Sequence, residues 1–309
     1  MVRESALSKR PTAFPITSYT LFMAANPATS PLIAISVGNT RTQVARFAKG
    51  NLDHVERFTN DNLAPIVQQV TTWWKENGNV NLPDFAAGQP AIAMASVNDP
   101  IASRLASAIE DQLTVEVFHI GDDMPVPIGQ QLEPETITGI DRLLNAAAAF
   151  DRLKQACVIV DAGTAVTVDF VDGQGTFHGG AIAPGATMQL KAMHEHTAAL
   201  PELAFRAPDA EPFGRNTTQA MLQGVFHGIR GMVQRLVEQY AEAYGAFPMV
   251  VATGGDAQVL FGNHEMVDRI VPELTLLGIA AAARHALSDD DVEERATDDR
   301  KATSDPEEE

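Results

Sequence analysis

PLIAISVGNTRTQVARF, residues 31–47, is the stretch whose pattern decides the fold. An apolar run leads into Gly-Asn-Thr and then into alternating residues, which predicts a buried strand, a tight turn and a returning strand. Glycine lets a ligand approach the backbone closely, and successive N–H groups of a turn can surround an anion. A plain hairpin needs the glycine just as much, so this stretch alone leaves both interpretations open.

Two further glycine turns follow apolar runs later in the chain. ACVIVDAGTAVTVDFVD, residues 156–172, has the layout of the first stretch, and its Gly163 lies 125 residues after Gly38. PMVVATGGDAQVL, residues 248–260, leads into a Thr-Gly-Gly turn. Three such turns in two similar halves indicate a duplicated architecture with a nucleotide-binding cleft between the halves.

Strand-like and helix-like stretches alternate between the two ends of the chain, which is typical of an α/β fold. The strong helical pattern TGIDRLLNAAAAFDRLKQ closes the first half, after which the strand pattern restarts. We therefore expect an N-terminal domain over residues 31–150 and a C-terminal domain over 151–287. Residues 1–30 are expected to be a disordered leader or to precede a late translation start, and 288–309 an acidic disordered tail.

The composition is that of a soluble globular protein, with 45% hydrophobic and 20% charged residues in 309. No apolar run is long enough to span a membrane, and the net charge of −18 argues against a nucleic-acid surface. Cys157 is the only cysteine, which excludes an intrachain disulfide and suits the cytoplasm. The leader is too polar for a convincing signal peptide, although secretion stays an alternative.

Acids near the glycine turns are the candidates for phosphoryl-transfer chemistry. Asp141 lies two residues after Gly139 at the head of a predicted helix, where it could accept a proton or simply cap the first turn. Beside it, Arg142 could grip a carboxylate or phosphate. Asp161 ends a buried strand and so needs a cation or backbone donors. Asp169, on the returning strand, is a further candidate that could simply face solvent or a turn.

Two other features invite a functional interpretation. His194 and His196 are spaced i, i+2 and share no helical face, which argues against a zinc site. A long predicted helix after residue 215 carries a small-residue face that would allow close approach of another helix, formed by Gly224, Gly228 and Gly231.

Six ordered motifs resemble the type III pantothenate kinase family, a branch of the acetate kinase/actin/Hsp70-like superfamily. They are VGNTRTQ, GIDRLLNAAAA, VDAGTAVTVD, GGAIAPGATMQLKAMHEHTAALP, GRNTTQAMLQGVFHG and ATGGDAQVL. The resemblance covers about residues 31–287. It implies two ribonuclease-H-like (actin-like ATPase) domains with an interdomain nucleotide cleft.

The resemblance also implies an activity. Family members phosphorylate the primary hydroxyl of pantothenate with ATP, giving 4'-phosphopantothenate in the first step toward coenzyme A. They use Mg²⁺ with ATP and a monovalent cation, K⁺ or NH₄⁺. They act as cytoplasmic homodimers, with no nucleic-acid or membrane partner. A different small-molecule kinase on the same fold stays an alternative.

Carried over residue by residue, the family pattern assigns roles. The general base would be Asp141, and the monovalent cation would bind Asp161. The pantothenate site would be lined by Gly139, Ile140, Asp141, Arg142 and Thr217. The ATP site would be formed by Ser36, Gly38, Asn39, Thr40, Gly163, Thr164, Gly254 and Gly255.

Ser36 departs from the family pattern, which has Asp at this position to help hold Mg²⁺. A neutral hydroxyl is a poorer magnesium ligand than a carboxylate. Three interpretations follow: magnesium is held through water and by ATP, another acid substitutes, or the protein is a weakly active or non-catalytic regulatory relative that binds nucleotide or pantothenate.

Overall fold

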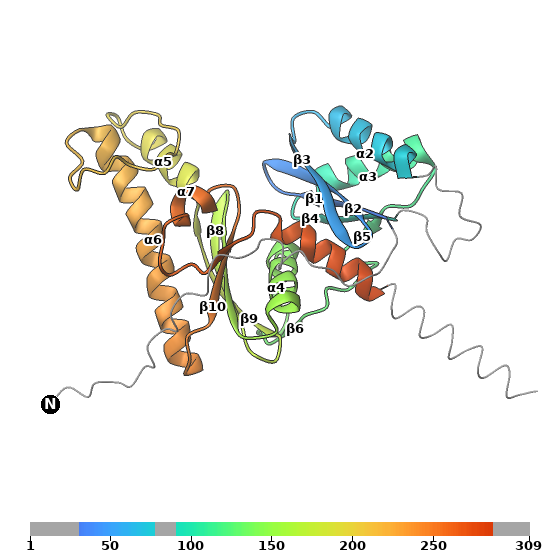
Figure 1. Cartoon of the computed structure of the whole chain (residues 1–309). Helices are drawn as coiled ribbons and strands as arrows, with labels where there is room; N and C mark the ends of the chain where they lie inside the picture. The colour runs from blue at the N-terminus through green and yellow to red at the C-terminus, as the bar shows by residue number, and fades with distance from the viewer. Residues whose placement is uncertain (1–30, 78–90, 287–309) are drawn as a thin grey trace, which may run out of the picture. The chain divides into compact units, whose positions relative to one another are not determined.

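The computed structural model describes residues 31–77 and 91–286, so the expected leader and acidic tail lie outside the described residues. The described chain forms two compact units, coloured by residue number in Figure 1. One unit comprises residues 128–274, and the other comprises 31–127 together with 275–286. Each unit has its own sheet and is described by itself.

The first sheet belongs to the unit that begins at residue 31, and its strand order is β3-β2-β1-β4-β5. Its strands are β1 (Leu32–Val37), β2 (Arg41–Ala48), β3 (Asn51–Thr59), β4 (Ala91–Ser96) and β5 (Phe118–His119). The first three strands pair antiparallel, whereas β4 runs parallel to β1 and to β5.

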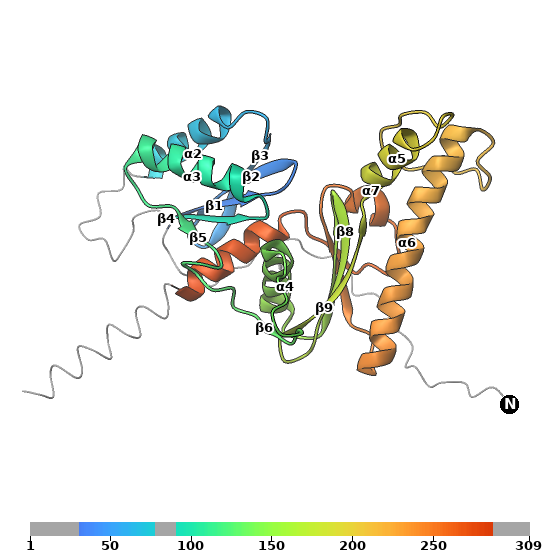
Figure 2. The same cartoon turned by 180° about the vertical axis from the view of Figure 1, so that it is seen from behind.

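Helices α2 (Ala64–Asn77) and α3 (Asp99–Leu113) cover one face of the first sheet. They pack beside each other in both views (Figures 1 and 2). Because strand side chains alternate between faces, Ile35 and Val37 enter this core and Ser36 points to the opposite face. The predicted buried strand of the opening stretch is therefore confirmed, and its polar residue is aimed away from the core.

The second sheet belongs to the other unit, with strand order β11-β10-β7-β8-β9-β6. Its strands are β6 (Gly129–Gln130), β7 (Cys157–Ala162), β8 (Ala165–Val171), β9 (Thr176–Pro184), β10 (Met249–Thr253) and β11 (Arg269–Ile270). Strands β7, β8 and β9 pair antiparallel, while β10 is parallel to β7 and to β11. Apart from the added β6, this repeats the topology of the first sheet, which confirms the expected duplication and the ribonuclease-H-like α/β fold.

The two faces of the second sheet carry different helices. A hydrophobic core joins one face to α5 (Ala186–Glu195), α6 (Thr217–Tyr244) and α7 (Ala257–Phe261), and it includes the β7 residues Val158 and Val160. The opposite face contacts α4 (Ile140–Leu153). Figures 1 and 2 show α4 and α6 on opposite sides of β8.

The division of the chain differs from the sequence expectation in one respect. A boundary between residues 150 and 151 would place α4 in the first domain, whereas its contacts group it with the second sheet, and the units divide after Pro127. The reason is that the side of α4 carrying Arg142 and Asn145 faces β7 and β8, where these residues bind Asp169 and Asp161. A helix of residues 274–286 starts at that unit's last residue and joins the other unit from residue 275.

No helix within residues 31–77 and 91–286 is long and apolar enough to cross a membrane.

The small-residue face of α6 is exposed. A Cβ added at Gly224, Gly228 or Gly231 would meet no atom within 4 Å. The described part of this chain therefore packs no helix against these glycines.

Candidate active site

The beginning of α4 carries the polar residues around which the site is built. The helix starts at Ile140 immediately after Gly139, so Asp141 lies in the first turn as predicted, where the helix N-terminus favours a negative charge. Arg142 and Asn145 are three residues apart, and Asp141 and Asn145 are four apart, so all three lie on neighbouring positions of one helical surface.

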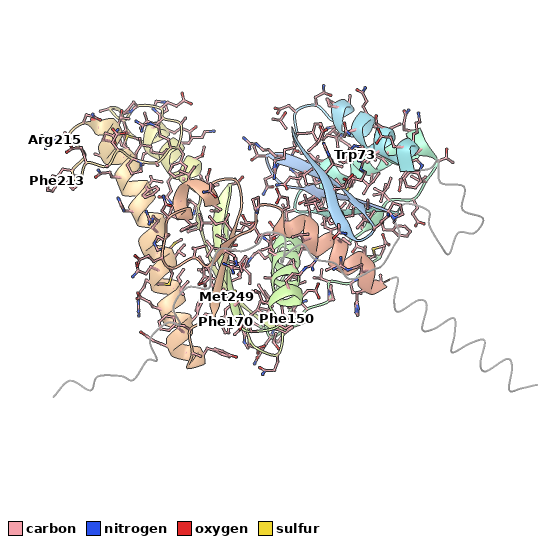
Figure 3. The ribbon with its side chains drawn as sticks, in the orientation of Figure 1. Trp73, Phe150, Phe170, Phe213, Arg215 and Met249 are labelled. Carbon is pink, nitrogen blue, oxygen red and sulfur yellow. The ribbon has the colours of Figure 1, made fainter. Side chains whose placement is uncertain are left out.

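Strands β7 and β8 carry the acids that lie opposite α4. In the antiparallel register Asp161 pairs with Thr167, and Asp169 lies two residues beyond Thr167, so all three share one face. The next residue, Phe170, labelled in Figure 3, points to the other face, where its ring lies 6.1 Å from Tyr240 of α6. Strand alternation thus separates the polar face from the α6 core.

Asp169 forms a buried ion pair with Arg142. The Arg142 Nε donates to both carboxylate oxygens of Asp169, at 3.2 and 3.1 Å, and Nη2 donates to Oδ1. Asp169 is only 1% exposed, and the guanidinium lies 5.6 Å from the centre of the Phe177 ring. The interpretation that Asp169 simply faces solvent or a turn is therefore wrong, because its strand position turns it toward α4.

Asp161 has a neutral partner. The Nδ2 of Asn145 donates to its Oδ2 at 3.0 Å, and no ion pair within the described residues includes Asp161. Its other oxygen, Oδ1, lies on the side of the glycine turns: a Cβ added at Gly254 would be 2.5 Å from it, and one at Gly163 3.6 Å. The expected need for a donor is met by an amide side chain that the sequence argument missed.

The missed residue had a signal in the sequence. Asn145 interrupts a run of apolar residues on a predicted helix and lies four positions after Asp141. A polar residue at a core position of a helix needs a hydrogen-bond partner, and the position one turn from a candidate base pointed to the site.

Three acids, Asp141, Asp161 and Asp169, lie close together in the site with one guanidinium, that of Arg142. Burial raises the pKa of Asp161 to about 7, and the negative charges of Asp141 and Asp169 add to this, while the Asn145 hydrogen bond opposes it. Asp161 keeps some accessible surface, but desolvation still dominates its titration. Burial likewise raises the pKa of Asp141 and of Asp169, and contacts with Arg142 oppose both shifts.

A raised pKa suits a general base, because a carboxylate that holds a proton more strongly accepts one more readily. The Oδ1 of Asp141 accepts the Arg142 backbone N–H at 2.8 Å. The arrangement therefore places a carboxyl group and a guanidinium side by side at one helix start.

Two of the three predicted glycine turns lie together at one edge of the second sheet. The Asp256 N–H, just after the Thr-Gly-Gly turn, donates to Ala162 O at 2.9 Å. Gly254 has φ of +93°, a conformation that glycine adopts without strain. Parallel pairing of β7 with β10 brings these turns together, since the carboxyl ends of parallel strands share an edge.

The first glycine turn has the same form in the other unit. The Gly38 N–H donates to Arg41 O at 2.9 Å, just as the Gly163 N–H donates to Ala165 O at 2.9 Å. Asn60 fixes the turn, because its Nδ2 donates to Gly38 O at 2.8 Å. Ser36 and Asp161 occupy equivalent positions, each two residues before the turn glycine at the end of a matching strand.

Gly185 gives a test of how tightly the second turn is built. Its N–H donates to Thr164 O at 3.0 Å, and an added Cβ would lie 2.5 Å from that same oxygen. Gly185→Ala is therefore expected to destabilise the protein by about 1–3 kcal/mol in chemical denaturation. The matched control Gly228→Ala, on the exposed face of α6, is expected to stabilise it by about 0.5–1 kcal/mol. Equal effects of the two substitutions would contradict this account.

Other candidates lie elsewhere. Thr217 is the first residue of α6, on the opposite side of the second sheet from α4, so the structure does not bring it to Asp141. His194 uses Nδ1 in a 2.8 Å hydrogen bond with Leu200 O. Within the described ranges no three His, Cys, Asp or Glu residues gather as a metal site.

Two sheets of one ribonuclease-H-like topology, each with a glycine turn at its strand ends, define the fold class of this chain as a duplicated α/β fold, and its site places a carboxyl group beside an arginine at a helix start. The chain belongs to the type III pantothenate kinase family, whose model matches residues 32–239, more than half of its length. It is therefore a kinase.

Individual relatives agree with this assignment. The type III pantothenate kinase of Dehalococcoides mccartyi strain CBDB1 is 31% identical over 255 residues, covering 82% of this chain and 95% of the relative. That of Anaeromyxobacter sp. strain Fw109-5 is 32% identical over 254 residues, covering 80% and 96%.

A solved structure described as a "conserved putative Baf family transcriptional activator" from Campylobacter jejuni has a TM-score of 0.52 and 18% identity. It covers 82% of this chain and 98% of that one. At this identity the likeness concerns the fold alone.

Proposed function

We propose that this kinase transfers the γ-phosphoryl group of ATP to the primary hydroxyl of pantothenate, giving 4'-phosphopantothenate for coenzyme A biosynthesis. The observation that carries the proposal is the start of α4, where Asp141 stands beside an Arg142 whose guanidinium is fixed by Asp169. The names of the family and of its relatives supply the substrate.

Asp141 is proposed as the general base, which accepts the proton of the pantothenate hydroxyl as the hydroxyl oxygen attacks the γ-phosphorus. Arg142 would hold the pantothenate carboxylate or a phosphoryl oxygen through its Nη1 and the second hydrogen of Nη2, because its Nε and one Nη2 hydrogen are bound to Asp169. General-base help is worth roughly 10²–10⁴-fold. The rest of the rate must come from positioning and charge neutralisation.

The glycine turns are proposed to hold the ATP phosphates through their backbone N–H groups. The candidates of the first turn and the strand before it are Ser36, Gly38, Asn39 and Thr40. Those of the second turn are Gly163 and Thr164, and those of the third are Gly254 and Gly255. The pantothenate candidates Gly139 and Ile140 are proposed on the family pattern. Thr217 is proposed on the same pattern, but it would have to come from the other subunit of the proposed homodimer, because in this chain α6 and α4 cover opposite faces of the second sheet.

Asp161 fits a monovalent cation, K⁺ or NH₄⁺. Burial raises the pKa of its carboxyl group to about 7, and within the described residues its side chain accepts from the neutral amide of Asn145. A carboxylate in such a place is matched by a cation better than by a further neutral group. A bound cation would supply positive charge that offsets the charge of the phosphates.

Magnesium is proposed to enter with ATP. Magnesium sites in kinases commonly use one or two carboxylates together with phosphate oxygens and water. Ser36 in β1 of the first sheet occupies the position that corresponds to Asp161 in β7 of the second sheet, so the first turn has a hydroxyl where the second has a carboxyl group. We also propose that the protein is cytoplasmic and forms a homodimer; light scattering after size-exclusion chromatography tests the dimer.

The deciding experiment is a kinase assay on the full chain. Purified protein with ATP, Mg²⁺, K⁺ and pantothenate is expected to release ADP, with little release when pantothenate is omitted. A panel of other small alcohols and hydroxy acids separates pantothenate from a different acceptor. Absence of pantothenate-dependent ADP release under K⁺, NH₄⁺ and Na⁺ alike would overturn the proposal.

Ser36 favours a second candidate function, a nucleotide- or pantothenate-binding regulatory relative with weak turnover or none. Calorimetry would then show ligand binding while the assay shows no ADP. Rapid pantothenate-dependent ADP formation would exclude this candidate.

Ser36→Asp tests the magnesium role of this position. If the hydroxyl limits magnesium binding, the variant is expected to reach half-maximal rate at a lower Mg²⁺ concentration, because a carboxylate is the better ligand. Titration of Mg²⁺ at fixed ATP measures this. The control Ser36→Asn, isosteric with Asp but uncharged, should leave the requirement close to that of wild type. An unchanged requirement in Ser36→Asp would show that this position does not limit magnesium use.

A further inference from the structure

Asn145 is a buried amide in an apolar part of α4. Its side chain is 1% exposed, and its neighbours on the helix, Leu144 and Ala146, belong to the core. A buried amide costs stability unless it is hydrogen-bonded. Asn145 is bonded to Asp161, whose Oδ2 accepts from Nδ2 at 3.0 Å.

Because of this hydrogen bond, the two carboxylate oxygens of Asp161 have different surroundings. Oδ2 is held by α4, while Oδ1 lies on the side of Gly163 and Gly254, the glycines of the second and third turns. A Cβ at residue 254 would lie 2.5 Å from Oδ1, so a side chain there would obstruct that oxygen. The carboxylate therefore presents one oxygen toward the turns in a fixed orientation.

Asp161 and Asp169, the two acids on the face of the sheet toward α4, have partners of different charge. Asp169 is neutralised by the guanidinium of Arg142, whereas Asp161 receives a neutral donor from Asn145. A neutral donor orients a carboxylate and leaves its negative charge in place. Arg142 and Asn145 are one helical turn apart, so a single helix makes this distinction.

We propose that Asn145 is the positioning residue of the monovalent-cation site. It holds the Asp161 carboxyl group so that Oδ1 faces the glycine turns, with no ion-pair partner within the described residues, in a position to bind K⁺ or NH₄⁺. The inference rests on the proposed function, which places a cation at Asp161. Residues that orient a metal ligand in this way typically change metal affinity by about 10- to 100-fold when replaced.

The test measures cation binding by thermal stability of the full chain. The melting temperature is followed as KCl replaces choline chloride at constant ionic strength, without nucleotide and with a non-hydrolysable ATP analogue. Wild type is expected to gain stability with K⁺ in a saturable manner. Asn145→Leu, of similar volume and without a donor, should need about 10- to 100-fold more K⁺ for half-saturation.

Two variants make the result specific. Asp161→Asn removes the charge that the cation needs and should abolish the K⁺ response. Ala149→Gly, one turn farther along α4, weakens the helix without touching the site. It should lower the melting temperature and leave the half-saturating K⁺ concentration unchanged.

The outcomes separate this inference from the proposed function. Equal half-saturation in wild type and Asn145→Leu overturns the inference, and the kinase assay then still judges the activity. A wild type whose melting temperature ignores K⁺ under both conditions also overturns it. A raised half-saturation in Asn145→Leu, but not in Ala149→Gly, supports it even if pantothenate is not the acceptor.

Discussion

Replacing Asp141 with Asn is expected to lower kcat for pantothenate by about 10²- to 10⁴-fold, the usual contribution of a general base. The amide keeps the size of the side chain and can still accept the Arg142 backbone N–H, which Asp141 accepts at 2.8 Å. It cannot accept the hydroxyl proton. Steady-state kinetics give the loss, and calorimetry is expected to show ATP affinity little changed.

Asp151→Asn is the matched control for the loss of an acid on the same helix. Asp151 lies near the other end of α4 in an exposed ion pair with Lys154, at 3.0 Å. Its replacement should leave kcat within about twofold of wild type, since exposed pairs contribute little. Activity of Asp141→Asn close to that of this control would remove Asp141 as the base.

Replacing Asp169 with Asn is expected to destabilise the protein by about 3–5 kcal/mol, the usual cost of removing one partner of a buried ion pair. The charge of Arg142 would remain in a buried place without its carboxylate, which holds it now through both Nε and Nη2. Chemical denaturation measures the loss. The KM for pantothenate should rise as well, because the guanidinium is no longer fixed.

Two controls decide what the Asp169 pair does. Glu195→Gln breaks the exposed pair with Lys191, whose N···O distance is 3.6 Å, and should cost no more than about 1 kcal/mol. The double variant Arg142→Met with Asp169→Leu should recover much of the lost stability, since apolar pairs often replace buried ion pairs without loss. Its activity should stay low. Recovery of activity together with stability would show that Arg142 serves packing alone.

Much of the fold could be predicted from the sequence because it rests on local patterns. The three strand–glycine–strand or strand–glycine–helix stretches lie where the apolar periodicity placed them, and α4 begins at Ile140 beside the predicted Gly139. The 125-residue spacing of Gly38 and Gly163 corresponds to two sheets of one topology. The site's Asp141 and Arg142 followed from their position at a helix start.

The partners of the acids could not be predicted in this way. In the sequence Asp169 resembled a surface residue of a returning strand, and the guanidinium that pairs with it belongs to Arg142 on α4, 27 residues away. Asn145 looked like an ordinary helix position, and its acid lies 16 residues away on β7. The boundary between the two units could not be predicted for the same reason, because α4 belongs to the unit whose strands β7 and β8 it contacts.

The sequence by itself determined the strands, the glycine turns, the helix that carries the candidate base, and the family. Those features depend on periodicity and turn chemistry within a few residues. The tertiary structure decided which acid on the shared face of β7 and β8 receives a guanidinium and which receives an amide. These pairings depend on which residues of α4 lie opposite which residues of β7 and β8 when the helix packs on the sheet. No local pattern encodes this register, because it arises only when the helix packs on the strands.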